Sequence, residues 1–264
     1  MAHIITIANY KGGVAKTETS KALGMILAQK GYKVLMIDSD PQCNLTKQLH
    51  ADENEGFMKV LLTGNALDEG IIQHLEAVDF IASSSALNTL RQDDLKYGIT
   101  TLRAALTAPG ISDAYDFIVI DTPPAYSDSS LNSLNAADTV VAPATPDLDS
   151  INGTINLKLM ILSLNKTHPN RRIKLGGILL TMLDKRRVNA RNMIEIANKA
   201  AAQIRTKVYG ATIQPAEIVK MCKFNQEILV SRYPNRPVTL DYIQFANELL
   251  ADILPDPSGG DPDE

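Results

Sequence analysis

Short apolar runs alternate along this chain with longer stretches in which apolar residues recur every three or four positions. The short runs are rich in β-branched residues and predict buried strands, whereas the periodic stretches predict amphipathic helices. The expected strands comprise residues 3–9, 33–38, 78–83, 116–121, 139–144, 174–183 and 210–213. The expected helices comprise residues 17–30, 150–164, 189–204 and 240–254.

This order of elements predicts the fold class. Strands that alternate with helices form βαβ units, so we expect an α/β fold with one mostly parallel, twisted sheet flanked by helices on both faces. The absence of Trp and an aromatic content of 5% fit the aliphatic core of such a sheet. The 264 residues contain no repeat or linker, and we expect a single domain over residues 1–254. Residues 255–264 form an acidic tail, which we expect to be disordered.

The cysteines and the apolar runs exclude several classes of protein. Cys43 and Cys222 form no CxxC pair, so a metal or iron–sulfur site built on cysteines is not expected. A reducing compartment fits this usage. No signal peptide precedes the first strand, and no apolar run reaches the roughly 18 residues that a membrane span requires. We therefore expect a cytoplasmic protein without a transmembrane helix.

Candidate binding and catalytic residues are found at the carboxyl ends of three predicted strands. They are found in residues 9–17, 38–42 and 121–124. The carboxyl ends of parallel strands meet at one edge of a sheet, which is where α/β proteins bind their ligands. The sequence therefore predicts one site at this edge.

The first of these segments has the composition of a phosphate-binding loop. A Gly-rich turn between a strand and a helix directs backbone N–H groups at phosphate oxygens, and the helix N-terminus adds positive potential. Lys16 is expected to reach the β- and γ-phosphates, and the Thr17 hydroxyl to bind Mg²⁺. The usual pattern is GxxxxGK[ST], but Ala15 precedes Lys16 here and the loop opens with KGG. The expected nucleotide-binding residues are Lys11, Gly12, Gly13, Val14, Ala15, Lys16, Thr17 and Glu18.

Together the three segments resemble the motifs of the ParA/MinD group of P-loop ATPases. KGGVAKT resembles that group's deviant Walker A motif, IDSDPQCNLT (residues 37–46) its second motif and IDTPP (residues 120–124) its third, in the same order. LLTMLDKR and TIQP in the C-terminal half resemble the group more loosely. The resemblance implies ATP and Mg²⁺ as cofactors and a homodimer with ATP at its interface. It also implies a role for each of the two loop lysines: Lys16 acts in cis, and Lys11 reaches the nucleotide of the partner subunit.

The resemblance assigns further roles to acidic residues. Asp40 would orient the attacking water, and it joins Lys11 and Lys16 as a catalytic residue. Asp121 would hold Mg²⁺ through a water, with Asp38 near the metal, so the implied metal site comprises Thr17, Asp38, Asp40 and Asp121. Residues 42–46 and 122–126 resemble the two switch segments that respond to the γ-phosphate. Asp184 and Pro215 are the nearest matches to residues that contact adenine, although a surface cap explains Asp184 equally well.

Glu18 departs from the resemblance. The group commonly has Thr or Ser at this position, close to the α-phosphate. A carboxylate facing that phosphate would be repelled. Two alternatives follow: the side chain turns to solvent or to a lysine, or it weakens nucleotide binding and slows hydrolysis.

Charge is distributed unevenly along the chain. Residues 151–236 contain 16 Lys and Arg against 4 Asp and Glu, whereas the formal net charge of the whole chain is -4. This basic segment indicates either a DNA-binding face or a solvated surface. The final predicted helix carries Asp241, Glu248 and Asp252 and no basic residue, so an anionic membrane would repel it. The candidate DNA-phosphate contacts are Lys185, Arg186, Arg187, Arg191, Lys220 and Lys223.

These features favour an ATP-dependent DNA-partition ATPase. The resemblance implies that such a protein dimerises on ATP, binds DNA non-specifically, associates with the nucleoid, and is released when a ParB-like partner stimulates hydrolysis. Two alternatives remain open: a nucleotide-gated scaffold that hydrolyses little ATP, and a MinD-like membrane-associated ATPase, which the acidic final helix disfavours.

Overall fold

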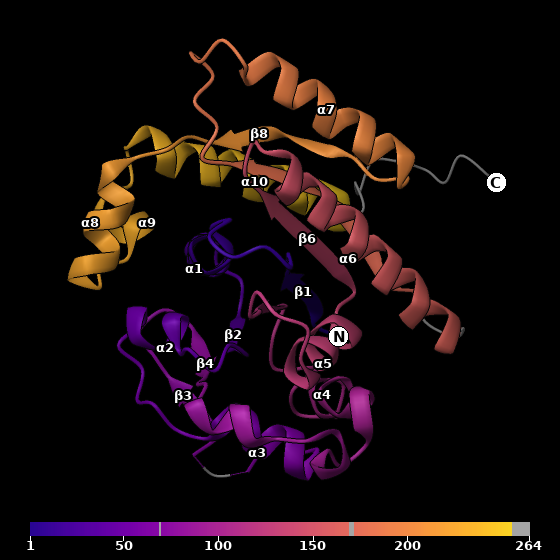
Figure 1. The fold of residues 1–264 in the computed structure, drawn as a ribbon. Coiled ribbons are helices and arrows are strands. Elements are labelled where there is room, and N and C mark those ends of the chain that lie inside the picture. The colour runs from indigo at the N-terminus through magenta and orange to yellow at the C-terminus, as the bar shows by residue number, and fades with distance from the viewer. Residues whose placement is uncertain (69, 169–171, 255–264) are drawn as a thin grey trace, which may run out of the picture.

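The computed structural model describes residues 1–68, 70–168 and 172–254, and it contains a single eight-stranded sheet (Figure 1). The strand order is β3-β4-β2-β5-β1-β6-β7-β8, and every neighbouring pair is parallel except β3 with β4. The predicted α/β class with a mostly parallel sheet is therefore confirmed. The strands are β1 (His3–Ile7), β2 (Val34–Asp38), β3 (Ile72–His74), β4 (Asp79–Ile81), β5 (Phe117–Asp121), β6 (Thr139–Ala144), β7 (Lys174–Thr181) and β8 (Val208–Ile213).

Helices cover both faces of this sheet (Figure 1). The first face is covered by α1 (Lys16–Gln29), α2 (Asn44–Gln48), α8 (Glu217–Asn225), α9 (Leu229–Arg232) and α10 (Pro237–Ile253). The second face is covered by α3 (Gly56–Thr63), α4 (Thr101–Leu106), α5 (Asp128–Ala136), α6 (Leu148–Thr167) and α7 (Ala190–Gln203). Three short 3₁₀ turns lie between β4 and α4, at Ser85–Thr89, Gln92–Asp94 and Gly98–Thr100.

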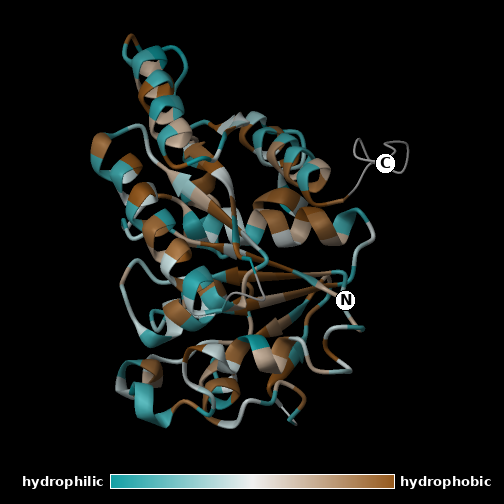
Figure 2. Cartoon of the chain, turned by 90° about the vertical axis from the view of Figure 1, so that its right-hand side faces the viewer, coloured by the Kyte–Doolittle hydropathy of each residue, from teal (hydrophilic) through white to brown (hydrophobic). Residues whose placement is uncertain are grey.

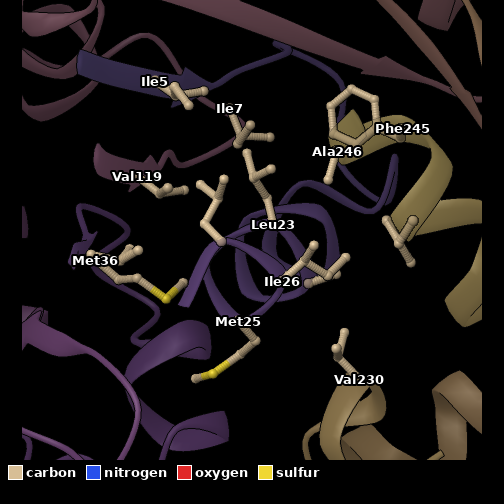
Figure 3. Packing of buried hydrophobic residues seen from close by; sticks show 14 of the residues in the cluster. Ile5, Ile7, Leu23, Met25, Ile26, Met36, Val119, Val230, Phe245 and Ala246 are labelled. Atoms are coloured by element: carbon tan, nitrogen blue, oxygen red, sulfur yellow. The ribbon is translucent and has the colours of Figure 1, made fainter. Parts of the chain in front are cut away.

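The core lies between the sheet and these two helical layers. Hydrophobic residues concentrate on the strands and on the inward sides of the helices (Figure 2). On the first face, Leu23 and Ile26 of α1 pack against Ile5 and Ile7 of β1, and Phe245 of α10 completes the cluster (Figure 3). Burial of such aliphatic side chains contributes about 1.5–3 kcal/mol each, so α1 is held firmly at the centre of the molecule.

The strand register brings together the three segments that carry the candidate site residues, 9–17, 38–42 and 121–124. Ile7, the last residue of β1, lies opposite Asp121, the last residue of β5. Asp38, at the end of β2, lies opposite Asp121 on the other side. The loops that follow these three strands therefore leave the sheet at one level and side by side.

Several elements were not predicted from the hydrophobic pattern. The clearest case is α5, whose buried side includes Ser130, Asn132, Ser133 and Asn135. These polar groups are hydrogen-bonded in the interior, as Ser133 is to Ser39 at 3.0 Å, so apolar periodicity gives no sign of the helix. The helix α10 also begins at Pro237, three residues before its predicted start. The expected disordered tail, residues 255–264, lies outside the described residues. Within the described ranges, none of the helices combines the length and hydropathy that crossing a bilayer requires.

Candidate nucleotide-binding site

The loop between β1 and α1 adopts a conformation that turns its backbone inward. Gly13 and Ala15 both have positive φ, 75° and 64° respectively. Asn9 fixes the start of the loop, since its side-chain amide donates to the Pro143 carbonyl at 2.7 Å and its oxygen accepts from the Lys11 N–H at 3.1 Å. A Cβ at Gly153 of α6 would lie 2.6 Å from the Asn9 Oδ1, so only glycine lets α6 approach this anchor.

Thr17 and Ser20, in the first turns of α1, both hydrogen-bond Asp121 at the end of β5. Thr17 Oγ1 donates to Asp121 Oδ2 at 2.7 Å, and Ser20 Oγ donates to Oδ1 at 2.9 Å. Lys16 is buried, and its Nζ donates to the Lys11 carbonyl at 3.1 Å. The first turn of α1, with the predicted metal-binding hydroxyl of Thr17, therefore forms one cluster with Asp121, the acid expected to hold Mg²⁺ through a water.

The charges in this cluster are perturbed by burial. Burial, followed by the nearby charge of Asp38, raises the pKa of Asp121 to about 8, even though Thr17, Ser20 and Lys16 oppose that rise. Burial likewise lowers the pKa of Lys16, against the attraction of Asp121 and Asp40. Both shifts disfavour the charged forms, and a cation next to Asp121 or an anion next to Lys16 would favour those charged forms again.

Asp38 and Asp40 have different surroundings. Asp38 is fully buried and accepts from the Thr46 N–H at 2.9 Å and the Thr46 hydroxyl at 2.8 Å, which ties the start of α2 to the end of β2. Asp40 lies above it and borders the open space in front of the loop. Its backbone N–H donates to Asp38 at 3.0 Å. The structure thus brings Asp40 to the site and leaves Asp38 beneath it.

A hollow of about 330 Å³ lies directly in front of this loop, and we call it the loop hollow. Its lining includes most of the predicted residues, namely Gly12, Gly13, Ala15, Lys16, Thr17, Glu18 and Asp40. Asn44, Thr122 and Pro124, which belong to the two expected switch segments, also line it. Sequence reasoning missed Gln48, Met182 and Val219. Gln48 lies on α2 four residues after Asn44, and this helical spacing was an available sign.

Lys11 points away from Lys16 and pairs with an acid of its own chain. Its Nζ forms an ion pair with Asp147, the N-cap residue of α6. Both side chains remain partly exposed, at 34% and 41% respectively. Asp147 also accepts from the Ser150 N–H at 2.9 Å and the Thr145 hydroxyl at 2.6 Å, so it is held in place independently of Lys11.

Glu18 turns to a lysine, which was one of the two alternatives that the sequence left open. Its carboxylate lies 3.4 Å from the Nζ of Lys21, one turn further along α1. Lys21 is almost completely buried and also donates to the side-chain oxygen of Gln48 at 2.6 Å. The Glu18 carboxylate is therefore partly neutralised by Lys21.

The two residues expected near adenine lie beside the loop hollow, not in it. Asp184 and Pro215 share a smaller hollow of about 190 Å³. Asp184 is bound by Arg186, whose Nε lies 2.9 Å from its carboxylate, and this bond lowers the pKa of Asp184. Met182, with φ of 54°, lines the loop hollow two residues before Asp184. A base that leaves the loop hollow in this direction would meet Met182 first.

The six candidate DNA contacts separate into two groups. Lys185, Arg186 and Arg187 follow β7, and Arg191 lies in the first turn of α7, so these four form one exposed cluster. Lys220 and Lys223 lie on α8, where they border the loop hollow and face the nucleotide-binding loop. The second pair therefore stands close enough to a bound nucleotide to influence it electrostatically.

Comparisons with known proteins show the family of the chain. A family model described as an AAA domain matches residues 2–175. The chain is 32% identical over 254 residues to the chromosome-partitioning ATPase Soj of Thermus thermophilus, which covers 94% of this chain and 96% of that protein. It is 31% identical over 219 residues to the chromosome partitioning protein ParA of Caulobacter vibrioides, with coverages of 80% and 79%. The chain belongs to the ParA/MinD family of P-loop NTPases, among its Soj and ParA members.

Solved structures show the same fold. An ATP complex of McdA from Cyanothece superposes with a TM-score of 0.77 at 23% identity, covering 94% of this chain and 96% of that chain. A plasmid partition protein from Borrelia burgdorferi, bound to AMPPNP, superposes with a TM-score of 0.74 at 23% identity and covers 96% of this chain and 100% of that one.

Proposed function

We propose that this protein is a DNA-partition ATPase that binds Mg·ATP in the loop hollow, dimerises around it, and binds DNA non-specifically until hydrolysis releases it. The observation that carries the proposal is the convergence of three strand ends on one loop hollow, with Lys16, Thr17, Asp40 and Asp121 within it or at its floor. The functions of its Soj and ParA relatives support the same conclusion.

The phosphates would be held by the backbone of the loop and by Lys16. The loop leads into the N-terminal end of α1 at Lys16, whose helix dipole favours an anion. Lys16 is already buried there, with a lowered pKa, so a triphosphate would restore its charged form. Lys16 would exchange its bond to the Lys11 carbonyl for phosphate oxygens.

The donors around Thr17 fit Mg²⁺. This ion prefers oxygen ligands and is commonly held by one or two protein groups together with phosphates and waters. Thr17 and Asp121 supply a hydroxyl and a carboxylate in direct contact, with Asp40 nearby. The described residues contain no group of three or more His, Cys, Asp or Glu that would bind a metal unaided, which accords with a metal that arrives with the nucleotide. Bound Mg²⁺ would neutralise charge on the phosphates.

Dimerisation would place Lys11 at the nucleotide of the partner subunit. The Lys11 side chain is partly exposed, and within the described residues its one ion pair is with Asp147, so its release costs little. The ring of Tyr10 stacks on that of Tyr126 in the proposed switch segment, with centroids 4.4 Å apart. This stack supports a mechanical link between the loop and the third motif.

DNA binding would use the exposed cluster of Lys185, Arg186, Arg187 and Arg191. Such contacts to phosphates give salt-sensitive binding without sequence preference. The membrane alternative finds no support in α10, because the apolar side of this helix, which includes Tyr242, Phe245 and Leu249, is buried against the body of the protein. A ParB-like protein that stimulates hydrolysis is the partner that this proposal requires.

The main argument for the nucleotide-gated scaffold is weakened. It rested on Glu18 weakening nucleotide binding or hydrolysis, whereas the Glu18 carboxylate is paired with Lys21. What still distinguishes the partition ATPase from the scaffold is whether the protein hydrolyses ATP and releases phosphate.

The test is ATP hydrolysis by the native protein and by Asp40→Ala, with ATP-dependent dimer formation followed by light scattering. We expect slow phosphate release from the native protein and a stable ATP-bound dimer without release from the variant. Hydrolysis by Asp40→Ala at the native rate would remove Asp40 from its catalytic role. Absence of ATP binding by the native protein would refute the proposed function.

A further inference from the structure

A second concentration of positive charge lies at the end of the sheet opposite the loop hollow. The strand β7 connects the two ends: Thr181 Oγ1 donates to the Val14 carbonyl of the loop at 3.1 Å, and Lys174 begins the strand seven residues earlier. At about 3.3 Å per residue, the two ends are roughly 23 Å apart. In Figure 1 the arrows of β6 and β8 point left, whereas α6 and α7 run back to the right, where this second concentration lies.

This opposite end is hollowed. A space of about 590 Å³ is bordered by the C-terminal half of α6, the start of β7, the α7–β8 turn and the end of α10, and we call it the basic hollow. Its cationic lining residues come from three separate parts of the chain and are Lys158, Arg172, Lys174, Arg205 and Lys207. Its acidic lining residue is Asp252.

Among the described residues, most of this charge has no ion-pair partner. Lys207 pairs with Asp252 at 2.6 Å. Within the ranges that the structure describes, Lys158, Arg172, Lys174 and Arg205 form no ion pair. Burial, together with the positive charge of Arg172, lowers the pKa of Lys158. The lining therefore carries an excess of like charge that an anion would relieve.

The wall of the basic hollow is fixed by hydrogen bonds that leave its cations available. Asn165 donates to the Ile173 carbonyl at 3.0 Å and accepts from the Ile173 N–H at 2.8 Å, which joins α6 to the segment before β7. Thr206 Oγ1 donates to the Leu175 carbonyl at 2.9 Å and fixes the α7–β8 turn to β7. These bonds hold in place the backbone segments that carry the cations, which lowers the entropy cost of binding a ligand.

We propose that the basic hollow is a second anion-binding site, which takes a compact phosphate ligand bearing several negative charges. Arg172 and Arg205 would contribute planar donors suited to phosphate oxygens, and Lys158 and Lys174 point charges. The apolar side chains of Leu162, Ile173 and Leu175 line the same space, so the ligand also meets apolar surface. A DNA backbone fits less well, because the cations surround a concave space whereas duplex phosphates require contacts along an extended path.

The site is independent of the proposed ATPase function, so the two can fail separately. Pyrophosphate is a suitable probe, but it also fits the loop hollow. The binding experiment therefore uses full-length Lys16→Gln, in which the loop lysine is removed, and follows titration with inorganic pyrophosphate by calorimetry. The comparison protein is the triple variant K16Q/K158Q/R172Q. The matched control is K16Q/K199Q, because Lys199 is an exposed lysine on α7 that does not line the basic hollow.

We expect K16Q and K16Q/K199Q to bind about one pyrophosphate per chain, and the triple variant to bind it at least roughly tenfold more weakly, since two charge-assisted contacts are lost. Absence of binding by K16Q, or equal binding by all three proteins, would overturn the proposal. So would a result in which pyrophosphate does not bind but K158Q/R172Q weakens binding to duplex DNA, because the basic hollow would then belong to a nucleic-acid face.

Discussion

At the scale of single residues, the two loop lysines are distinguished by their partners. Lys16 is buried and directed to the start of α1, whereas Lys11 is partly exposed and paired with Asp147. This difference fits the proposal that Lys16 acts at the nucleotide of its own chain, whereas Lys11 leaves Asp147 to act at the nucleotide of the partner subunit. It also makes Asp147 a competitor for Lys11 in the monomer.

Lys11→Ala tests the action across the interface. We expect this variant to bind ATP with nearly native affinity, because Lys11 does not point into its own loop hollow. It should fail to dimerise with ATP, because the cation that offsets the partner's phosphates is missing. Nucleotide titration and light scattering measure the two properties separately. An ATP-dependent dimer of Lys11→Ala would contradict the account of this lysine.

Asp147→Asn tests the competition. The change removes the charge that holds Lys11, while Asn remains a good N-cap for α6. A partly exposed ion pair is worth about 0.2–1 kcal/mol, and two such pairs are broken in each dimer, so ATP-dependent dimerisation should occur at a concentration about 2- to 30-fold lower. Asp149→Asn, in the same first turn of α6, is the matched control and should behave as the native protein. Weaker dimerisation of Asp147→Asn would show that Asp147 assists Lys11.

Lys21→Met tests the pairing that accommodates Glu18. Removal of the buried ammonium leaves the Glu18 carboxylate and the Gln48 oxygen without their partner. We expect a loss of about 3 kcal/mol in the free energy of unfolding, measured by urea denaturation. The double variant Glu18→Met/Lys21→Met should recover most of this loss. If the single and double variants are equally unstable, the cost arises from packing and not from the unpaired charge.

At the scale of elements, the site could be predicted where local sequence determines it and not where distant segments meet. The loop with Thr17 and the acid Asp121 could be predicted because the loop begins just after one apolar strand and Asp121 ends another. The parallel register then places the ends of these strands side by side. The pairing of Lys11 with Asp147 joins residues 136 positions apart and has no local pattern. Likewise, α5 buries serines and asparagines, so its polar sequence concealed it. The position of α8 beside the loop depends on how the C-terminal segments pack around α1.

The double variant K220Q/K223Q tests the position of α8. Both lysines border the loop hollow, so their removal should weaken Mg·ATP binding about fivefold in the absence of DNA, through lost long-range attraction. Lys199→Gln on α7 is the control and should bind normally. Unchanged ATP affinity, combined with weaker DNA binding, would show that these lysines contact DNA and do not influence the nucleotide.

At the scale of the whole molecule, the basic segment of residues 151–236 divides between the two ends of the sheet. Lys185, Arg186, Arg187 and Arg191 lie at the end that carries the loop, and the basic hollow lies at the other. The sequence predicted the excess charge but not this division, because β7 crosses the molecule between the two groups. DNA binding that responds to ATP is expected at the loop end.

The triple variant R186Q/R187Q/R191Q tests this expectation. Each phosphate contact contributes about 0.9 to the slope of log affinity against log salt concentration, so three contacts should reduce the slope by about 2–3. Binding isotherms at several salt concentrations provide the slope. K158Q/R172Q, which changes the opposite end, should leave it unaltered.

The most direct test of a nucleotide-gated DNA-binding ATPase is the affinity of the native protein for random-sequence duplex DNA with ATP, with ADP and without nucleotide. Each state is measured at about 50 mM and about 200 mM salt, a range over which phosphate contacts have large effects. We predict binding with ATP alone, weakened strongly at the higher salt concentration. Equal affinity in all three nucleotide states, or no binding in any of them, would contradict the account.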